Sequence, residues 1–336
     1  MVTERAPSHP PKPQARLEIS EQGLEQLSEE ERKLFLLLVP AHKRSAIHLS
    51  AFEGLYDANM IAEDTRYVER MEDKFRKDEN PDTAHLKRRA ELLEAITWDE
   101  IGHDNWLGRE AKPITASRYD DVKNGVDLIV EFFKKEKADE LDSRMGLSVD
   151  VTSNVSSLEE KFQRIKNDIR NGRMAYVKYF VSSQGARQEI PNVPKVVVGT
   201  DAVSIKELGL LRLEIHGLSR ALKENKKSGG LSPESIKSME TRLKDAVSKL
   251  AKHRVQLLFL GEIELQLKTF SDFAAKNNQP EIAREYEKAL ELIAEVKKDK
   301  TAPADKQGLK LSFDEEAANN NDGVYQALKI GLKIFE

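Results

Sequence analysis

Segments rich in β-branched residues first appear in the middle of this chain, between Pro113 and Gly199, and their order limits the possible folds most. Five such segments have strand character, and an amphipathic helix at 158–172 separates the third from the fourth. In chain order they are 114–119, 126–133, 147–153, 174–182 and 195–201. A helical pattern precedes them. Helix, three strands, helix and strand in this order predict an α/β fold with a mixed sheet, to which the last segment adds one more strand.

The segments on either side of this core have helical periodicity. We predict an N-terminal helical region at 20–93, the α/β core at 94–203 and a C-terminal helical region at 204–300. Four prolines within the first 13 residues predict a disordered arm at 1–19. The remaining residues, 301–336, predict a polar linker and an apolar tail that docks on the body.

Local signals predict where some of the flanking helices begin and end. Ser28 and Glu31 have the spacing of a capping box, so a helix is expected to begin there. Pro40 is expected to end that helix. A second helical stretch is expected from Ser45 to Arg76, and one long helix from Pro233 to Gln279.

Composition excludes several classes of protein. The chain has 336 residues, a net charge of −4 and no cysteine, so disulfides, cysteine zinc sites, iron–sulfur clusters and thiol nucleophiles are excluded. The glycine-rich motifs of nucleotide-binding loops and the nucleophile elbow of hydrolases do not occur in the sequence. The longest apolar run, Leu34–Val39, is far shorter than the roughly 20 residues of a membrane-spanning helix. We therefore expect no membrane segment and a cytoplasmic location.

Two carboxylates stand where a strand normally carries apolar side chains. Asp127 opens the second strand-like segment, and Asp150 lies within the third. Two acids on neighbouring strands repel each other unless a divalent cation lies between them, and an incomplete set of oxygen ligands suits Mg²⁺ or Mn²⁺. Simpler explanations stay open: Asp127 follows the Asn124-Gly125 turn, and Asp150 fits the solvated face of an edge strand.

Together with the order of the elements, these acids resemble the core of the PD-(D/E)XK nuclease superfamily, with its restriction-endonuclease-like αβββαβ order. In that superfamily an acid on the first helix, an Asp at the start of the second strand and an Asp or Glu on the third strand hold the metal. The resemblance implies the ligands Glu100 in ITWDEIGHDNW, Asp127 in NGVDLIVEF and Asp150 in LSVDVT. It covers about residues 94–200.

The same superfamily carries a lysine two residues after the third-strand acid, where it orients or activates the attacking water. Thr152 stands at that position here. Some members have the lysine on the following helix or on a neighbouring strand, so the resemblance makes Lys161 the first catalytic candidate and Lys178 the second. If neither amine reaches the metal, it implies a relative that does not cleave.

A basic segment lies in the C-terminal helical region. Between Arg220 and Arg254 there are ten Lys and Arg residues and four Asp and Glu residues, which is a local excess of six positive charges. Such an excess can bind a phosphate backbone, and the residues that we expect to do so are Lys244, Lys249, Lys252 and Arg254. A solvated helix face is the simpler explanation.

Two functions therefore remain. The first is a nuclease that hydrolyses phosphodiester bonds of DNA or RNA with a carboxylate-bound Mg²⁺. The second is a catalytically inactive scaffold whose helical regions bind a protein partner or form a homodimer. Thr152, at the expected lysine position, favours the second.

Overall fold

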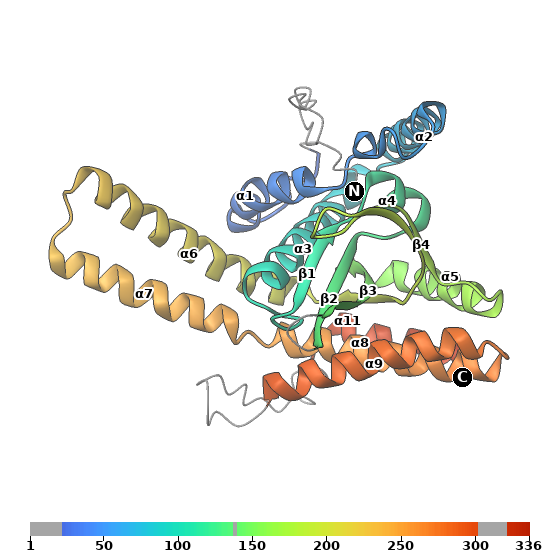
Figure 1. Ribbon diagram of the computed structural model, residues 1–336. Coiled ribbons are helices and arrows are strands. Elements are labelled where there is room, and N and C mark those ends of the chain that lie inside the picture. Colours follow the sequence, from blue (N-terminus) through green and yellow to red (C-terminus); the bar gives the residue numbers. More distant parts are fainter. Residues whose placement is uncertain (1–21, 137–139, 302–320) are drawn as a thin grey trace.

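The computed structural model (Figure 1) describes residues 22–136, 140–301 and 321–336. Its central sheet has the strand order β1-β2-β3-β6. These strands are β1 (Ala111–Thr115), β2 (Leu128–Glu136), β3 (Glu140–Thr152) and β6 (Lys195–Gly199). The first three pair antiparallel, and β6 pairs parallel with β3. The predicted α/β class and mixed sheet are therefore confirmed, whereas the expected disordered arm at 1–19 lies outside the described residues.

The sheet is buried on both faces. Leu128 and Val130 of β2 belong to the large core that the helices form with β3 and β6. Ile129 points the opposite way, because side chains alternate along a strand, and it packs against Val177 and Val193. A strand buried on both faces reads as a continuous apolar run, which is the pattern that made this segment recognisable in the sequence.

The segment at 174–182 forms a strand, but not in the central sheet. This strand, β4 (Ala175–Val181), pairs antiparallel with β5 (Arg187–Val193) in a separate two-stranded sheet. β5 has no clear strand pattern in the sequence because Pro191 and Asn192 interrupt it, and Asn192 has a left-handed φ of 60°. The fourth strand of the central sheet is therefore β6, the segment expected only as an addition.

The weak strand expected at 114–119 is present only in its first residues. β1 ends at Thr115, and Ser117 then begins the short helix α4 (Arg118–Asn124) by accepting a hydrogen bond from the Asp120 amide. Gly125 ends α4 with a φ of 63°, a left-handed conformation that glycine adopts without strain.

The N-terminal helices differ from the expected ones in their ends. The capping box of Ser28 and Glu31 begins α1 (Glu29–Ser45) as predicted, but the helix continues past Pro40. The missing bond of Pro40 leaves the carbonyl of Leu36 free, and the side chain of Leu36 is 56% exposed, so water can reach that side of the helix. The stretch expected at 45–76 is divided into a 3₁₀ turn, η1 (Leu49–Phe52), and α2 (Ala58–Lys77).

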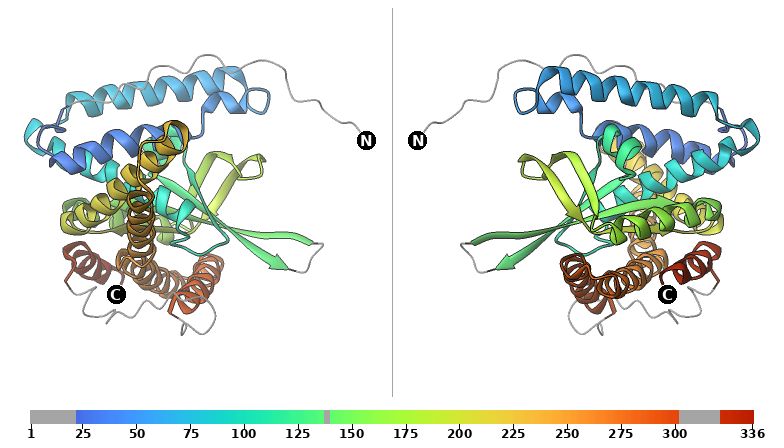
Figure 2. Two further views of the ribbon diagram at one scale, coloured as in Figure 1. Left: turned by 90° about the vertical axis from the view of Figure 1, so that its left-hand side faces the viewer. Right: turned by 90° about the vertical axis from the view of Figure 1, so that its right-hand side faces the viewer.

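The helix expected at 233–279 is two helices. α7 (Pro233–Ala251) ends at a turn through Lys252–Arg254, and α8 (Val255–Lys276) follows it. α6 (Ala202–Ser228) and α7 form an antiparallel hairpin, the α6–α7 arm, which projects away from the sheet (Figure 1) and is seen end-on in the left view of Figure 2. No helix in the described part of the chain is long and apolar enough to cross a membrane.

The remaining helices cover the core. α3 (Ala84–His103) packs against β1 and β3, α5 (Leu158–Arg170) follows β3, and α8 lies along α9 (Pro280–Thr301). The last helix, α11 (Gly323–Leu332), packs against α5 and α8. α11 buries Val324, Leu328 and Leu332. Phe335, in the turn after α11, adds to this packing, since its ring lies 4.8 Å from that of Phe270 and 5.2 Å from that of Phe273.

We predict that Phe335→Ala lowers the free energy of unfolding by about 3 kcal/mol, because truncation of a buried aromatic ring leaves a cavity. Phe335 is 3% exposed. Ile330→Ala is the control on the same segment: Ile330 is 65% exposed, so its truncation should change the stability by less than about 0.5 kcal/mol. Urea denaturation followed by circular dichroism measures both. Equal effects would contradict the docking described above.

Candidate active site

The two strand acids of the sequence lie side by side. β2 and β3 pair with Leu128 opposite Val149, so the antiparallel register brings Asp127, the residue before β2, next to Asp150. Both side chains lie on the face of the sheet opposite to Leu128 and Val149. The Asp127 carboxylate accepts a hydrogen bond of 2.9 Å from the backbone N–H of Val151, which fixes it against the end of β3.

Two lysines from other elements reach Asp150. Lys161, on α5, donates a hydrogen bond from Nζ to Oδ1 of Asp150. α5 buries Phe162 and Ile165 in the core, and Lys161, the residue before Phe162, lies beside this apolar stripe. Lys195, the first residue of β6, places its Nζ 3.7 Å from Oδ2 of Asp150 and also donates to the carbonyl of Gly125.

Two further acids share this environment. Burial raises the pKa of Glu94, on α3, well above its usual value, and the negative charges of Asp127 and Asp121 add to the shift. Burial also raises the pKa of Asp121, on α4, although the Arg118 guanidinium opposes the shift. We call Glu94, Asp121, Asp127, Asp150, Lys161 and Lys195 the carboxylate cluster.

The cluster shifts the pKa values of its own members in opposite directions. Burial, followed by the charges of Asp150 and Asp121, raises the pKa of Asp127 to about 8. Burial alone would lower the pKa of Lys161, but Asp150 and Asp127 raise it above its usual value. At neutral pH the Lys161 amine therefore keeps its proton, while the carboxyl group of Asp127 is held close to its titration point.

Glu100 does not belong to the carboxylate cluster. It is fully buried and accepts a 2.7 Å hydrogen bond from Nε of Arg212, on α6, which also contacts Asp99 and Asp104. The expectation that Glu100 joins Asp127 and Asp150 is therefore corrected, and the acid of α3 in their environment is Glu94. The two residues are six positions apart, which rotates them about 120° around a helix with 3.6 residues per turn.

Lys178 also lies elsewhere. Its Nζ contacts Oδ2 of Asp64, on α2, at 2.5 Å, and the hydroxyl of Tyr179 donates to the same oxygen at 2.6 Å. The amine is surrounded by tyrosine rings, with centroids 5.2 Å away for Tyr119 and 5.8 Å for Tyr56. Among the interactions of the described residues, none joins Lys178 to Asp127 or Asp150. Of the two candidate amines, Lys161 is the one that reaches the acids.

Thr152 and Asp120 have structural contacts. The hydroxyl of Thr152 donates to the carbonyl of Asn154 at 3.1 Å and accepts from its amide, so it closes the turn after β3. Asp120 is fully buried and accepts hydrogen bonds from the backbone amides of Lys178 and Tyr179 at 2.8 and 3.0 Å. It thereby ties α4 to β4.

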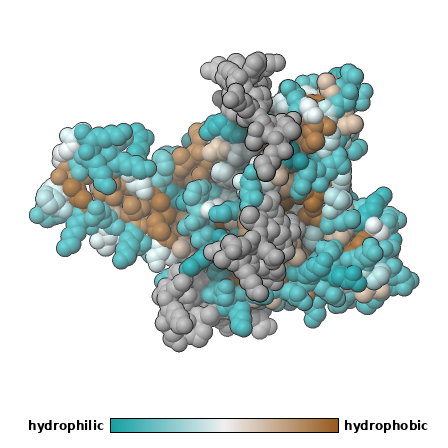
Figure 3. Space-filling model, in the orientation of Figure 1, coloured by the Kyte–Doolittle hydropathy of each residue, from teal (hydrophilic) through white to brown (hydrophobic). Residues whose placement is uncertain are grey.

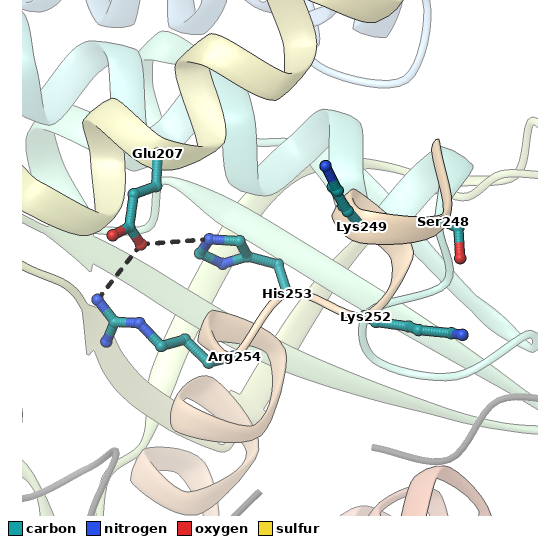
Figure 4. Close-up of a pocket in the computed structure, with 6 residues that line it drawn as sticks. All are labelled: Glu207, Ser248, Lys249, Lys252, His253 and Arg254. Atoms are coloured by element: carbon teal, nitrogen blue, oxygen red, sulfur yellow. Dashed lines mark ion pairs between the residues drawn. The ribbon is translucent and has the colours of Figure 1, made fainter. Parts of the chain in front are cut away.

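The predicted nucleic-acid-binding residues lie on α7 and in the turn that follows it, and none of them belongs to the carboxylate cluster. Lys249, Lys252 and Arg254 line a shallow pocket of about 500 Å³ together with Glu207, Ser248 and His253 (Figure 4). Lys244 is exposed on α7 and is not part of the pocket lining.

The chemistry of the carboxylate cluster fits a divalent cation in part. Buried carboxylates that repel one another are the oxygen donors that Mg²⁺ and Mn²⁺ take in proteins, and a cation between them would remove the repulsion that raises their pKa values. Over residues 22–136, 140–301 and 321–336, however, no three acidic or histidine side chains are arranged as a set of metal ligands. In this conformation the partners of Asp150 are Lys161 and Lys195.

No family model, no curated protein and no solved structure matches this chain.

The raised pKa of Asp127 predicts how stability depends on pH. In an unfolded chain an Asp titrates near pH 4. Because the folded protein holds this proton more tightly, the contribution of Asp127 to stability should fall as the pH rises from about 4 towards 8. Asp127→Asn keeps an oxygen for the Val151 amide and does not titrate. In EDTA it should be more stable than wild type by about 5 kcal/mol at pH 8 and equally stable at pH 4.

Urea unfolding at a series of pH values measures this difference. Asp245→Asn, at an exposed position on α7, is the matched control and should follow the wild-type curve within about 0.5 kcal/mol. A difference between Asp127→Asn and wild type that does not change with pH would refute the pKa assignment.

Proposed function

We propose that this chain is a metal-dependent nuclease that hydrolyses phosphodiester bonds of DNA or RNA. The observation that carries the proposal is the pair of Asp127 and Asp150 on adjacent strand positions, with the amine of Lys161 from α5 on Asp150 and Glu94 of α3 within the electrostatic influence of Asp127. In this proposal Glu94, Asp127 and Asp150 hold Mg²⁺ or Mn²⁺. When bound, the ion would supply charge for the phosphoryl oxygens and lower the pKa of a water molecule.

The order of the elements supports the same proposal. α3, β1, β2, β3, α5 and β6 follow one another as helix, three strands, helix and strand, with α4 and the β4–β5 hairpin inserted. The last strand runs parallel to the third. This order resembles the αβββαβ core of the PD-(D/E)XK superfamily, in which the acids lie where Asp127 and Asp150 lie here. Glu94 resembles the helix acid of that superfamily only in lying on α3, the helix that precedes the three strands.

The protonated state of Lys161 defines what this residue would do. An amine whose pKa is raised by Asp150 and Asp127 is a hydrogen-bond donor and a positive charge, not a proton acceptor. We infer that Lys161 orients the attacking water or holds a phosphoryl oxygen of the substrate. Thr152 cannot take this role, because its hydroxyl is committed to the turn at Asn154.

One observation favours the second candidate, a catalytically inactive scaffold. The ion pair of Lys161 with Asp150 neutralises the acid that would hold the metal, and it is complete without any cation. In that case the cluster would only hold α5 against β3, and the helical regions would bind a protein partner.

A cleavage assay separates the two functions. We expect wild-type protein to cut labelled DNA or RNA in Mg²⁺ or Mn²⁺ and not in EDTA. Asp127→Asn, Asp150→Asn and Glu94→Gln should each lower the rate at least about 100-fold, the loss expected from disturbing a metal site. Glu291→Gln, at an exposed position on α9, is the matched control and should keep the wild-type rate. Folded wild-type protein that cuts none of these substrates would refute the nuclease.

Metal binding can be tested without a substrate. Because a ligand stabilises the state that binds it, about 10 mM Mg²⁺ or Mn²⁺ should raise the Tm of wild type by several degrees and leave that of Asp150→Asn unchanged. Differential scanning fluorimetry with Na⁺ at equal ionic strength controls for general salt effects. Equal shifts in wild type and variant would contradict the assignment of Asp150 as a ligand.

A further inference from the structure

The positive charge of this chain is concentrated on the α6–α7 arm and its root. The segment 220–254 has an excess of six positive charges, and since the whole chain carries −4, the remainder carries −10. The arm projects from the body, so this charge is separated from the acidic remainder of the molecule (Figures 1 and 2). A separation of this kind attracts an anionic partner to the arm and not to the body.

Most of this charge is available to a partner. The three arginines of the segment pair with acids: Arg220 with Glu224, Arg242 with Glu214 and Arg254 with Glu207. The side-chain amines of all seven lysines lack an ion-pair or hydrogen-bond partner among the described residues. These lysines are Lys223, Lys226, Lys227, Lys237, Lys244, Lys249 and Lys252. Six of the seven are exposed, and Lys252 is half-buried.

The pocket at the root of the arm adds a shaped site to this charge. In Figure 4, Glu207 points between His253 and Arg254, with 3.5 Å from its Oε2 to each. Arg254 also donates to the Ser204 hydroxyl at 2.7 Å, so its guanidinium is held in place. Burial lowers the pKa of His253 to about 4, so the imidazole is neutral at pH 7. The uncompensated charge of the pocket therefore belongs to Lys249 and Lys252.

The arm itself is an unsuitable surface for self-association. Figure 3 shows apolar residues along the α6–α7 arm. Leu218, Ala246 and Leu250 of the two helices are buried, and the apolar side chains that stay exposed include Leu210, Leu231 and Val247. Exposed lysines lie on both helices, so two arms placed together would bring like charges into contact. The charge favours a polyanion.

We propose that the α6–α7 arm and the pocket at its root bind the sugar–phosphate backbone of the nucleic acid outside the cleavage centre. The proposal rests on the proposed nuclease function and adds where the substrate is held. α6 has 27 residues, so the arm is about 40 Å long, which corresponds to about 12 base pairs of duplex. The attraction of the polyanion would then come from the arm and not from the carboxylate cluster.

Salt-dependent binding tests this proposal without cleavage. The protein is the full chain with Asp150→Asn in EDTA, and the ligand is a fluorescein-labelled 30-base-pair duplex or a 30-nucleotide single strand. Fluorescence anisotropy at 50–200 mM salt gives the slope of log K against log [salt]. Lys249→Ala with Lys252→Ala should reduce the slope for the duplex by about 1.8, or for the single strand by about 1.4, since each phosphate contact contributes about 0.9 or 0.7.

Two matched variants serve as controls. Lys268→Ala with Lys276→Ala removes the same charge from exposed positions on α8 and should keep the wild-type slope. Lys249→Arg with Lys252→Arg keeps the charge and should also keep the slope. Equal slopes for the pocket variant and the α8 variant would overturn the proposal, and so would a wild-type chain that binds neither nucleic acid at 50 mM salt.

The result is independent of catalysis. A chain that binds with the predicted slopes but cuts nothing would leave the arm proposal standing and remove the nuclease. A chain that cuts, but whose pocket variant binds as wild type does, would remove only the arm proposal. Light scattering under the binding conditions completes the test, because a dimer that forms through the arm and excludes nucleic acid would also overturn it.

Discussion

The structure depends on two carboxylates that neighbouring strands bring together. Asp127 and Asp150 lie on the same face of the sheet because β2 and β3 pair with Leu128 opposite Val149. Such a pair is unfavourable unless hydrogen bonds and positive charge compensate it. The backbone amide of Val151 compensates Asp127, and Lys161 and Lys195 compensate Asp150. The placement of α5 and β6 follows from this requirement as well as from their apolar packing, because each delivers one amine to the acids.

The sequence predicted the parts of the fold and site that depend on local pattern. The strand segments and the α5 helix were recognisable from periodicity, and Asp127 and Asp150 from their positions in the strand segments, whereas Lys161 was named only through the family resemblance. It could not predict which strand completes the sheet, because β4 and β6 have similar β-branched runs and their pairing is decided by distant contacts. Glu94 was not among the predicted site residues for a similar reason. Glu94 and Glu100 are both acids of α3, and the face of the helix that turns towards Asp127 is decided by how α3 packs against β1 and β3.

Glu100 has a structural explanation of its own. Its carboxylate and those of Asp99 and Asp104 surround Arg212, so the network ties α3 to α6 at the root of the arm. Burial raises the pKa of Glu100 well above its usual value, since Arg212 compensates only part of the cost. Removal of one partner from a buried ion pair leaves the other charge buried without compensation, so the loss of stability is far larger than the net contribution of the intact pair. The direction of the arm relative to the sheet therefore depends on Glu100, the residue that the family resemblance assigned to the metal site.

The separation of charge in this chain has a consequence for how the proposed substrate would be held. A centre that combines several acids repels phosphates, and at physiological salt charges are screened over about 8 Å. Beyond this distance the attraction between the basic arm and the phosphates is largely screened. The arm must therefore contact the sugar–phosphate backbone directly to compensate for the repulsion from the acids. Contacts of this kind contribute to affinity but not to the chemical step. The residues that would make them lie on α6 and α7, whereas the acids lie on α3, α4, β3 and just before β2. Affinity and catalysis would thus depend on different elements, and the half-buried Arg212 network is what holds the two in a fixed relation.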